Sequence, residues 1–120
     1  MATVESIVYG ALSPLAGGNV FPDVAPSGFA QGGQPWVTYQ AVGGQVFATV
    51  DSVTPGLRNS RVQVSVWAYT RKQAAELMEQ CYQALANPTI RAVPIGAPVS
   101  TFEADTLLYG SSLDFSVTYN

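Results

Sequence analysis

Residues 58–85 read RNSRVQVSVWAYTRKQAAELMEQCYQAL, and this stretch decides the fold because an alternating strand runs directly into a helical pattern. Over residues 61–69, even and odd positions separate into two faces, which is the period-2 pattern of a strand with one buried side. The even face is apolar, and we expect it in the core: Val62, Val64, Val66 and Ala68. The odd face begins polar and ends aromatic, so we expect it to be covered by something outside the core: Arg61, Gln63, Ser65, Trp67 and Tyr69.

The helix that follows is predicted from Thr70, an N-cap residue type, to the Asn87-Pro88 pair that ends it. Its apolar side chains recur at helical spacing and form one stripe: Ala74, Leu77, Met78, Cys81, Tyr82 and Leu85. Cys81 is the single cysteine, and the chain has no His that could activate it. We therefore interpret Cys81 as a small buried apolar residue.

A second alternating pattern closes the chain over residues 107–119, where the large apolar side chains stand at odd positions: Leu107, Tyr109, Leu113, Phe115, Val117 and Tyr119. The phase is kept across Gly110-Ser111-Ser112. This continuity favours one long strand with a bend at the glycine over a hairpin turn at 110–112.

The remaining elements are shorter. A helix is predicted over residues 4–15, with Thr3 as its N-cap and Gly17-Gly18 as its end. Residues 19–35 are predicted to form a proline-rich loop with a short extended piece at 19–21. A hairpin is expected from strands 36–42 and 45–50 around Gly43-Gly44. Residues 51–60 and 88–100 read as loops, followed by a short strand at 101–104.

The pattern predicts an α+β fold: a mostly antiparallel sheet of about four strands with two helices packed on one face, in the order α-β-β-β-α-β. At 120 residues the chain is expected to form a single domain, residues 1–120.

Composition limits the functions open to the chain. Hydrophobic residues make up 48% and charged residues only 11%, so we expect other subunits to cover part of the exterior. The net charge of −3 and the five basic residues argue against nucleic-acid binding. No apolar run approaches the roughly 20 residues of a membrane helix, and we expect folding in a cytoplasm.

Catalysis and cofactors are not expected, since without His the chain lacks the commonest general base and metal ligand. Glu103, Asp105 and Asp114 could form a site for a hard cation, but we interpret them as solvated carboxylates at strand edges. The aromatic pairs at 36/39 and 67/69 could stack a ligand, although sheet packing or a subunit interface is the favoured interpretation.

The order of these pieces resembles the tail-completion or tail-terminator family of long-tailed bacteriophages and gene-transfer particles. The likeness is carried by an N-terminal helix, a helix after residue 70, and four segments: Val20-Phe21-Pro22, the run from Pro35 to Gln40 that leads to Gly43-Gly44, the run from Arg61 to Ala68, and the run from Leu107 to Tyr119. It extends over nearly the whole chain.

This resemblance implies a structural virion protein, assembled in the host cytoplasm, that forms a ring of six at the head-proximal end of the tail tube. The ring would terminate tube assembly and join the tail to the head-side connector or stopper protein, while duplex DNA passes through the lumen without specific binding. At −3 a copy, six copies carry −18. The alternatives are another neck or head-completion ring protein, or a small non-enzymatic binding module.

The expected contact surface with other subunits or partners combines the predicted hairpin, the 53–58 loop and the odd face of strand 61–69. Its candidate residues are Val46, Phe47, Val53, Leu57, Arg58, Arg61, Trp67 and Tyr69. No catalytic, metal or cofactor-binding residue is assigned.

Overall fold

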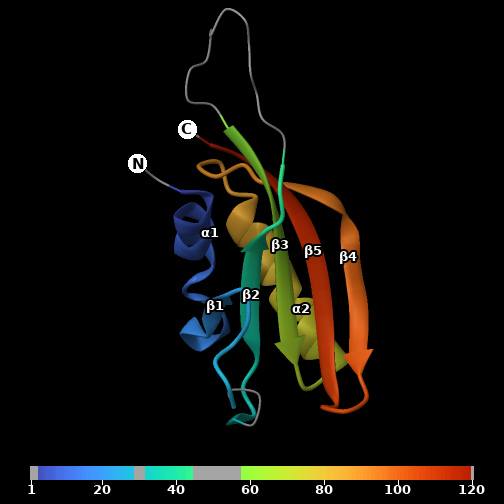
Figure 1. The fold of residues 1–120 in the computed structure, drawn as a ribbon. Coiled ribbons are helices and arrows are strands. Elements are labelled where there is room, and N and C mark those ends of the chain that lie inside the picture. Colours follow the sequence, from blue (N-terminus) through green and yellow to red (C-terminus); the bar gives the residue numbers. More distant parts are fainter. Residues whose placement is uncertain (1–2, 29–31, 45–57, 120) are drawn as a thin grey trace, which may run out of the picture.

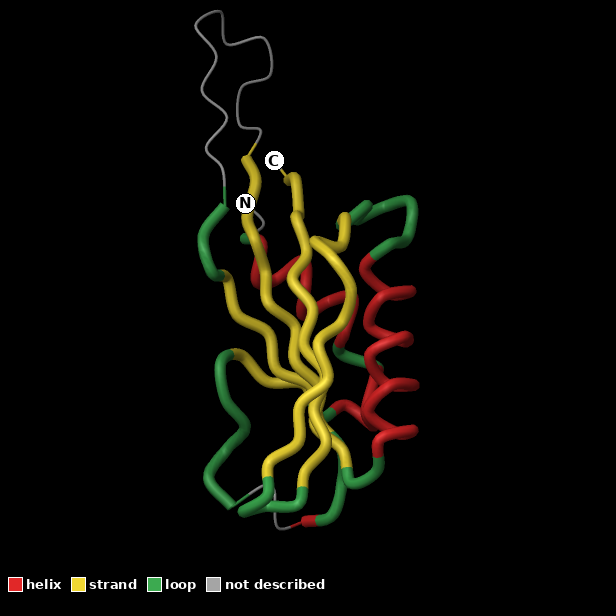
Figure 2. The backbone as a smooth tube through the Cα atoms, turned by 90° about the vertical axis from the view of Figure 1, so that its right-hand side faces the viewer, coloured by secondary structure: helices red, strands yellow, loops and turns green. Residues whose placement is uncertain are grey.

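The computed structural model describes residues 3–28, 32–44 and 58–119. It is an α+β fold in which one five-stranded sheet, of order β1-β2-β3-β5-β4, carries both helices on the same face (Figures 1 and 2). The elements are α1 (Val4–Leu12), a short 3₁₀ turn (Leu15–Gly18), β1 (Val20–Pro22), β2 (Trp36–Ala41), β3 (Arg58–Ala68), α2 (Arg71–Leu85), β4 (Val93–Glu103) and β5 (Leu108–Tyr119). Three of the four strand pairings are antiparallel, and β1 runs parallel to β2.

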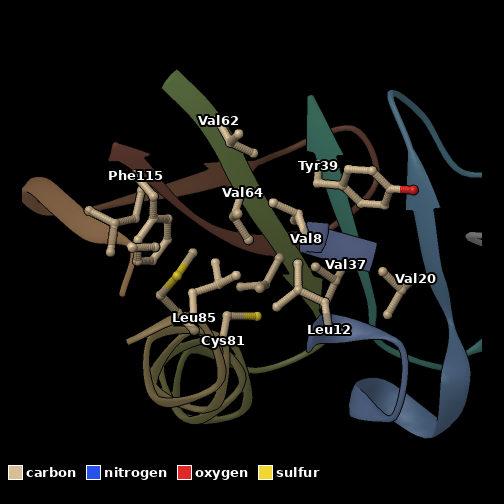
Figure 3. Packing of buried hydrophobic residues seen from close by; sticks show 14 of the residues in the cluster. Val8, Leu12, Val20, Val37, Tyr39, Val62, Val64, Cys81, Leu85 and Phe115 are labelled. Carbon is tan, nitrogen blue, oxygen red and sulfur yellow. The ribbon is translucent and has the colours of Figure 1, made fainter. Parts of the chain in front are cut away.

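The core lies between the sheet and the two helices (Figure 3). The even positions of β3 from Ser60 to Ala68 are buried, as the sequence predicted for residues 62–68, and Val64 has no exposed surface. Phe115 of β5 is likewise fully buried and packs against Tyr82 of α2, with ring centroids 6.5 Å apart. The predicted stripe of α2 therefore faces the sheet and holds it by apolar burial.

Both helices begin at the predicted caps. The Thr3 and Ser6 side chains cap each other's backbone N–H groups at the start of α1, and the Thr70 hydroxyl accepts from the N–H of Gln73 at the start of α2. The end of α1 differs from the prediction, since it stops at Leu12 instead of continuing to residue 15. Pro14 explains this, because it has no N–H with which to continue the helical ladder.

The prediction of a loop at 88–100 and a short strand at 101–104 is wrong, because a longer strand pairs with β5 at the sheet edge. These segments share one strand of 11 residues, β4, which contains Pro94 and Pro98 and shifts register between Ile95 and Val99. Proline is tolerated on an edge strand, where its missing N–H faces solvent. Among the described residues, the sheet has five strands, because β1 and β4 join the predicted strands 36–42, 61–69 and 107–119, while the fourth predicted strand, 45–50, is not described. The order of main elements in the described residues is α-β-β-β-α-β-β.

The other strands agree with the prediction in part. β5 is a single strand across Gly110, and the short extended piece became β1. β3 begins at Arg58, three residues before the predicted start, because its first residues pair with the end of β5. The returning strand predicted at 45–50 lies outside the described residues. Among the described residues, no helix is long and apolar enough to cross a membrane.

Candidate interaction surface

One face of the sheet carries no helix, and we call it the helix-free face (Figure 2). Its side chains come from even positions of β2, odd positions of β3 and even positions of β5, because successive residues of a strand point to opposite sides. The strand register places Trp36 opposite Trp67, with Ser65 and Gln63 of β3 following along the ladder toward its polar end. The helix-free face thus has an aromatic end and a polar end.

Two tryptophans make the aromatic end. The rings of Trp36 and Trp67 stack with centroids 6.3 Å apart and planes 27° apart. Gly110 lies opposite Trp67 on the other side, and a Cβ atom there would come within 3.0 Å of the indole and 2.5 Å of the Thr101 hydroxyl. Because Gly110 has no side chain, the Trp67 ring can lie against it.

A groove of about 480 Å³ opens beside these rings. The loop that follows β1, residues 23–28, forms one wall, and Leu108 and Glu103 lie on its lining with the two indoles. The N–H of Asp23 donates to the carbonyl of Tyr39 at 2.9 Å, which ties the start of that loop to β2. The groove is a feature of the folded sheet and its connecting loop, built from residues distant in sequence.

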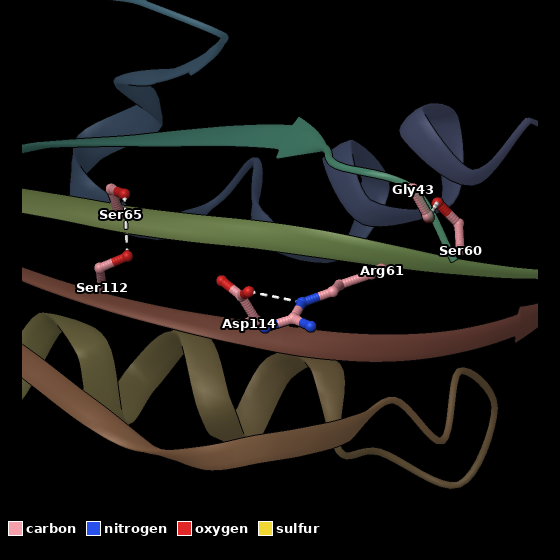
Figure 4. A network of polar contacts seen from close by, with 6 residues as sticks. All are labelled: Gly43, Ser60, Arg61, Ser65, Ser112 and Asp114. Carbon is pink, nitrogen blue, oxygen red and sulfur yellow. Dashed lines mark hydrogen bonds and ion pairs between the residues drawn. The ribbon is translucent and has the colours of Figure 1, made fainter. Parts of the chain in front are cut away.

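The polar end is crossed by side-chain contacts between β3 and β5 (Figure 4). The Arg61 guanidinium donates to the Asp114 carboxylate at 2.7 Å, and the Ser65 and Ser112 hydroxyls lie 3.4 Å apart. Half of the Arg61 side chain is exposed, so solvent screens the ion pair and its contribution to stability is small.

The edge strand β4 exposes large apolar side chains. Val93 and Val99 are 60% and 62% exposed, and Ile95 and Phe102 are also exposed. The strand contains no charged residue before Glu103. Natural sheets usually protect an exposed edge with charge, and β4 instead relies on its two prolines and its register shift.

Arg71 fixes one end of this edge. Its guanidinium donates to the carbonyls of Gly110 and Thr101, both at 3.0 Å, and lies 5.0 Å from the ring centroid of Tyr109. The same tyrosine ring contacts Phe102, with centroids 4.8 Å apart. The start of α2 therefore holds β4 and β5 together at the end near the aromatic groove.

The structure separates the predicted interface residues. Arg61 and Trp67 share the helix-free face of β3 but lie at its two ends. Arg58 starts β3 opposite Tyr119, with its guanidinium 5.1 Å from that ring. Tyr69 is half-buried in the turn before α2. Val46, Phe47, Val53 and Leu57 lie outside the described residues.

In the structure, the aromatic side chains have different partners from those suggested by the sequence. Trp36 and Tyr39 lie on opposite faces of β2, so together they do not stack a ligand. Tyr39 instead packs against Tyr9 of α1, with centroids 6.2 Å apart. Burial, followed by the charge of Glu5, raises the pKa of the Tyr39 hydroxyl. Tyr39 therefore belongs to the core, and Trp36 pairs with Trp67 of the next strand.

Sequence reasoning missed the partners of the residues that it chose. Trp36, Asp114 and the apolar edge of β4 are not among the predicted interface residues. Part of the signal for β4 is present in the sequence, because β-branched side chains stand at odd positions on both sides of its prolines: Val93, Ile95, Val99 and Thr101. Trp36 could be matched to Trp67 only through the register of β2 and β3.

The cysteine thiol and two of the candidate carboxylates are buried or paired within the fold. Cys81 is buried, and burial raises its thiol pKa to about 12, so the thiol is protonated at neutral pH. The Asp114 carboxylate binds Arg61, and the Glu103 carboxylate accepts from the Thr106 hydroxyl at 3.0 Å. Within residues 3–28, 32–44 and 58–119, no group of three or more Cys, Asp or Glu side chains is placed to hold a metal ion.

A family model described as "Tail completion protein gp17" matches residues 8–120. A search of curated protein sequences found no match.

Proposed function

This chain belongs to the tail completion protein gp17 family, and from that premise we propose that it closes a ring of six copies at the head-proximal end of the tail tube. Membership makes the chain a structural component of a bacteriophage tail and of the virion. The proposed ring terminates tube assembly and joins the tail to a head-side connector or stopper protein.

The observation that carries the ring is the apolar edge of β4. A strand with Val93, Ile95, Val99 and Phe102 exposed is a poor boundary for a free subunit, since exposed apolar edges promote association. In a closed ring, a neighbouring copy covers this edge in every subunit, because a head-to-tail contact repeats until the rotation closes. The missing N–H groups of Pro94 and Pro98 favour side-chain packing over the addition of a further strand.

The charges support a lumen through which duplex DNA passes without specific binding. Each of the four arginines has a partner within the chain: Tyr119 for Arg58, Asp114 for Arg61, two carbonyls for Arg71, and the Pro88 carbonyl for Arg91. The one lysine, Lys72, lies 3.9 Å from Glu76. A net charge of −3 a copy repels the phosphate backbone, which suits a passage more than a binding site.

Native mass spectrometry of the purified chain, alone and with its tail tube protein, tests the ring. We expect a six-copy species in at least the mixture with the tube protein. The double variant Val93→Lys with Val99→Lys should remain monomeric in both, because it places charge on the edge that a neighbour covers.

The double variant Gln80→Lys with Gln83→Lys is the matched control, since it adds the same two charges at exposed positions of α2. It should assemble like the parent chain. A parent chain that is strictly monomeric under both conditions would exclude the ring, and a β4 double variant that still forms six-copy species would exclude the β4 edge as its contact.

We propose no catalytic role. Glu103→Ala, Asp105→Ala and Asp114→Ala should assemble like the parent, and treatment with a chelator should leave the fold intact. Loss of folding with the chelator, or a stoichiometric ion in elemental analysis, would contradict this.

A further inference from the structure

We propose that the groove beside Trp36 and Trp67 is a docking site for an extended segment of a different protein, and that this segment presents an arginine beside a large apolar side chain. The inference concerns one end of the helix-free face and does not depend on ring closure.

The shape of the groove suits side chains of a partner. Its volume of about 480 Å³ falls in the range of sites that hold ligands or peptide side chains. The two stacked indoles and Leu108 supply apolar lining, and residues 23–28 of the loop after β1 also line the groove. Val24 of this loop is 77% exposed, so the wall itself offers a further apolar contact.

The charged residues that line the groove indicate which kind of partner it binds. Asp23 and Glu103 both line the groove, and no arginine or lysine does. In the described part of the chain, neither carboxylate forms an ion pair with a basic side chain. Arginine suits a lining that combines carboxylates with indoles, because its planar guanidinium pairs with carboxylates and also stacks on aromatic rings.

A second copy of this chain is the less suitable occupant. All five basic side chains of the chain already contact a group of their own subunit, as described above. Placing one of them in a neighbour's groove would break such a contact. The occupant that the charges favour is therefore a segment of another protein with a free arginine.

The chain contains two tryptophans, and both line the groove, so its intrinsic fluorescence reports on the groove directly. The probe is an acetylated, amidated Leu-Arg-Leu tripeptide, compared with the same peptide in which neutral citrulline replaces arginine. We expect a saturable change of emission with the arginine peptide and an affinity about tenfold higher than for the citrulline peptide.

Glu103→Gln keeps an oxygen that can accept from Thr106 but removes the charge, and it should bring the two affinities together. Asp105→Asn is the matched control, since Asp105 is exposed two residues away and does not line the groove. It should keep the preference for arginine, and circular dichroism confirms that both variants are folded.

Emission that does not respond to either peptide, or equal affinity of the parent chain for both, would overturn the proposal. So would a Glu103→Gln variant that keeps the full preference. Emission that changes with chain concentration even in the Val93→Lys, Val99→Lys double variant, which removes the β4 contact, would assign the groove to a second copy. None of these results affects the number of copies in native mass spectrometry, so this inference and the ring fail separately.

Discussion

Strands β3 and β4 have the same length and pair with the same partner, yet they differ in almost every other respect. Each has 11 residues and runs antiparallel to β5. Buried and more exposed residues alternate along most of β3, whereas all residues of β4 except Pro94 are exposed. Backbone pairing alone therefore does not bury a strand, and what differs is the presence of helices and a further strand beside β3.

The two strands therefore have different roles in the sheet. The inner face of β3 is covered by the chain's own helices and stabilises the fold. The large apolar side chains of β4 are exposed, and no helix lies against the helix-free face (Figure 2). We infer that β3 folds the subunit, while β4 and the helix-free face make its contacts with other proteins.

The largest expected effect is on the inner face of β3. Val64→Asp should prevent folding, because burying an unpaired carboxylate costs several kcal/mol, comparable with the stability of about 5 kcal/mol of a small domain. Val99→Asp on β4 should cost no more than about 1 kcal/mol. Urea unfolding followed by circular dichroism compares them, and equal losses would contradict the division between the strands.

A pair of phenylalanines sharpens the same comparison. Phe115→Ala should lower the free energy of unfolding by about 3–5 kcal/mol, because it leaves a cavity in the core. Phe102→Ala on β4 should lower it by about 1 kcal/mol, since that ring is half exposed and chiefly contacts Tyr109. Chemical denaturation of both variants checks the ratio, and a larger loss for Phe102→Ala would mean that β4 belongs to the core.

Gly110 joins the two strands, because it pairs with Trp67 of β3 and Thr101 of β4. Gly110→Ala should lower the free energy of unfolding by about 1–3 kcal/mol and change the tryptophan emission, since the new methyl group overlaps both neighbours. Combining it with Thr101→Ala removes one overlap and should recover part of the loss. Unchanged stability and emission would show that the indole has room to move.

The smallest expected effect is at the polar end of β3. Arg61→Ala should lower the free energy of unfolding by no more than about 1 kcal/mol, and by less at high salt, because the Arg61 side chain that pairs with Asp114 is half exposed. Denaturation at low and high salt measures this, with Asp114→Ala as the companion variant. A loss of unfolding free energy comparable with that of Phe115→Ala would show that the polar end stabilises the fold as much as the core does.

The sequence predicted those parts of the fold that one periodic pattern determines. β3 and β5 followed from alternation, and α2 from its cap and stripe, because each pattern is local. β4 was missed because Pro94 and Pro98 are evidence against a central strand but are acceptable at an edge, and edge position depends on the topology of the whole sheet.

The candidate site was predicted only in part for the same reason. Alternation identified Trp67 and Arg61 as outward-facing residues of β3. Their partners Trp36 and Asp114 come from β2 and β5, and the groove also needs the loop after β1. Contacts between strands depend on register, which a single sequence does not state.

The central claim is that the helix-free face serves assembly and does not hold the fold. Its most direct test is electron microscopy of particles from cells infected with phage that lacks this gene and supplied with Trp67→Ala. We expect a folded subunit by circular dichroism, with tails that are overlong or unattached to heads. Normal tails, or a Trp67→Ala subunit as unfolded as Val64→Asp, would contradict the claim.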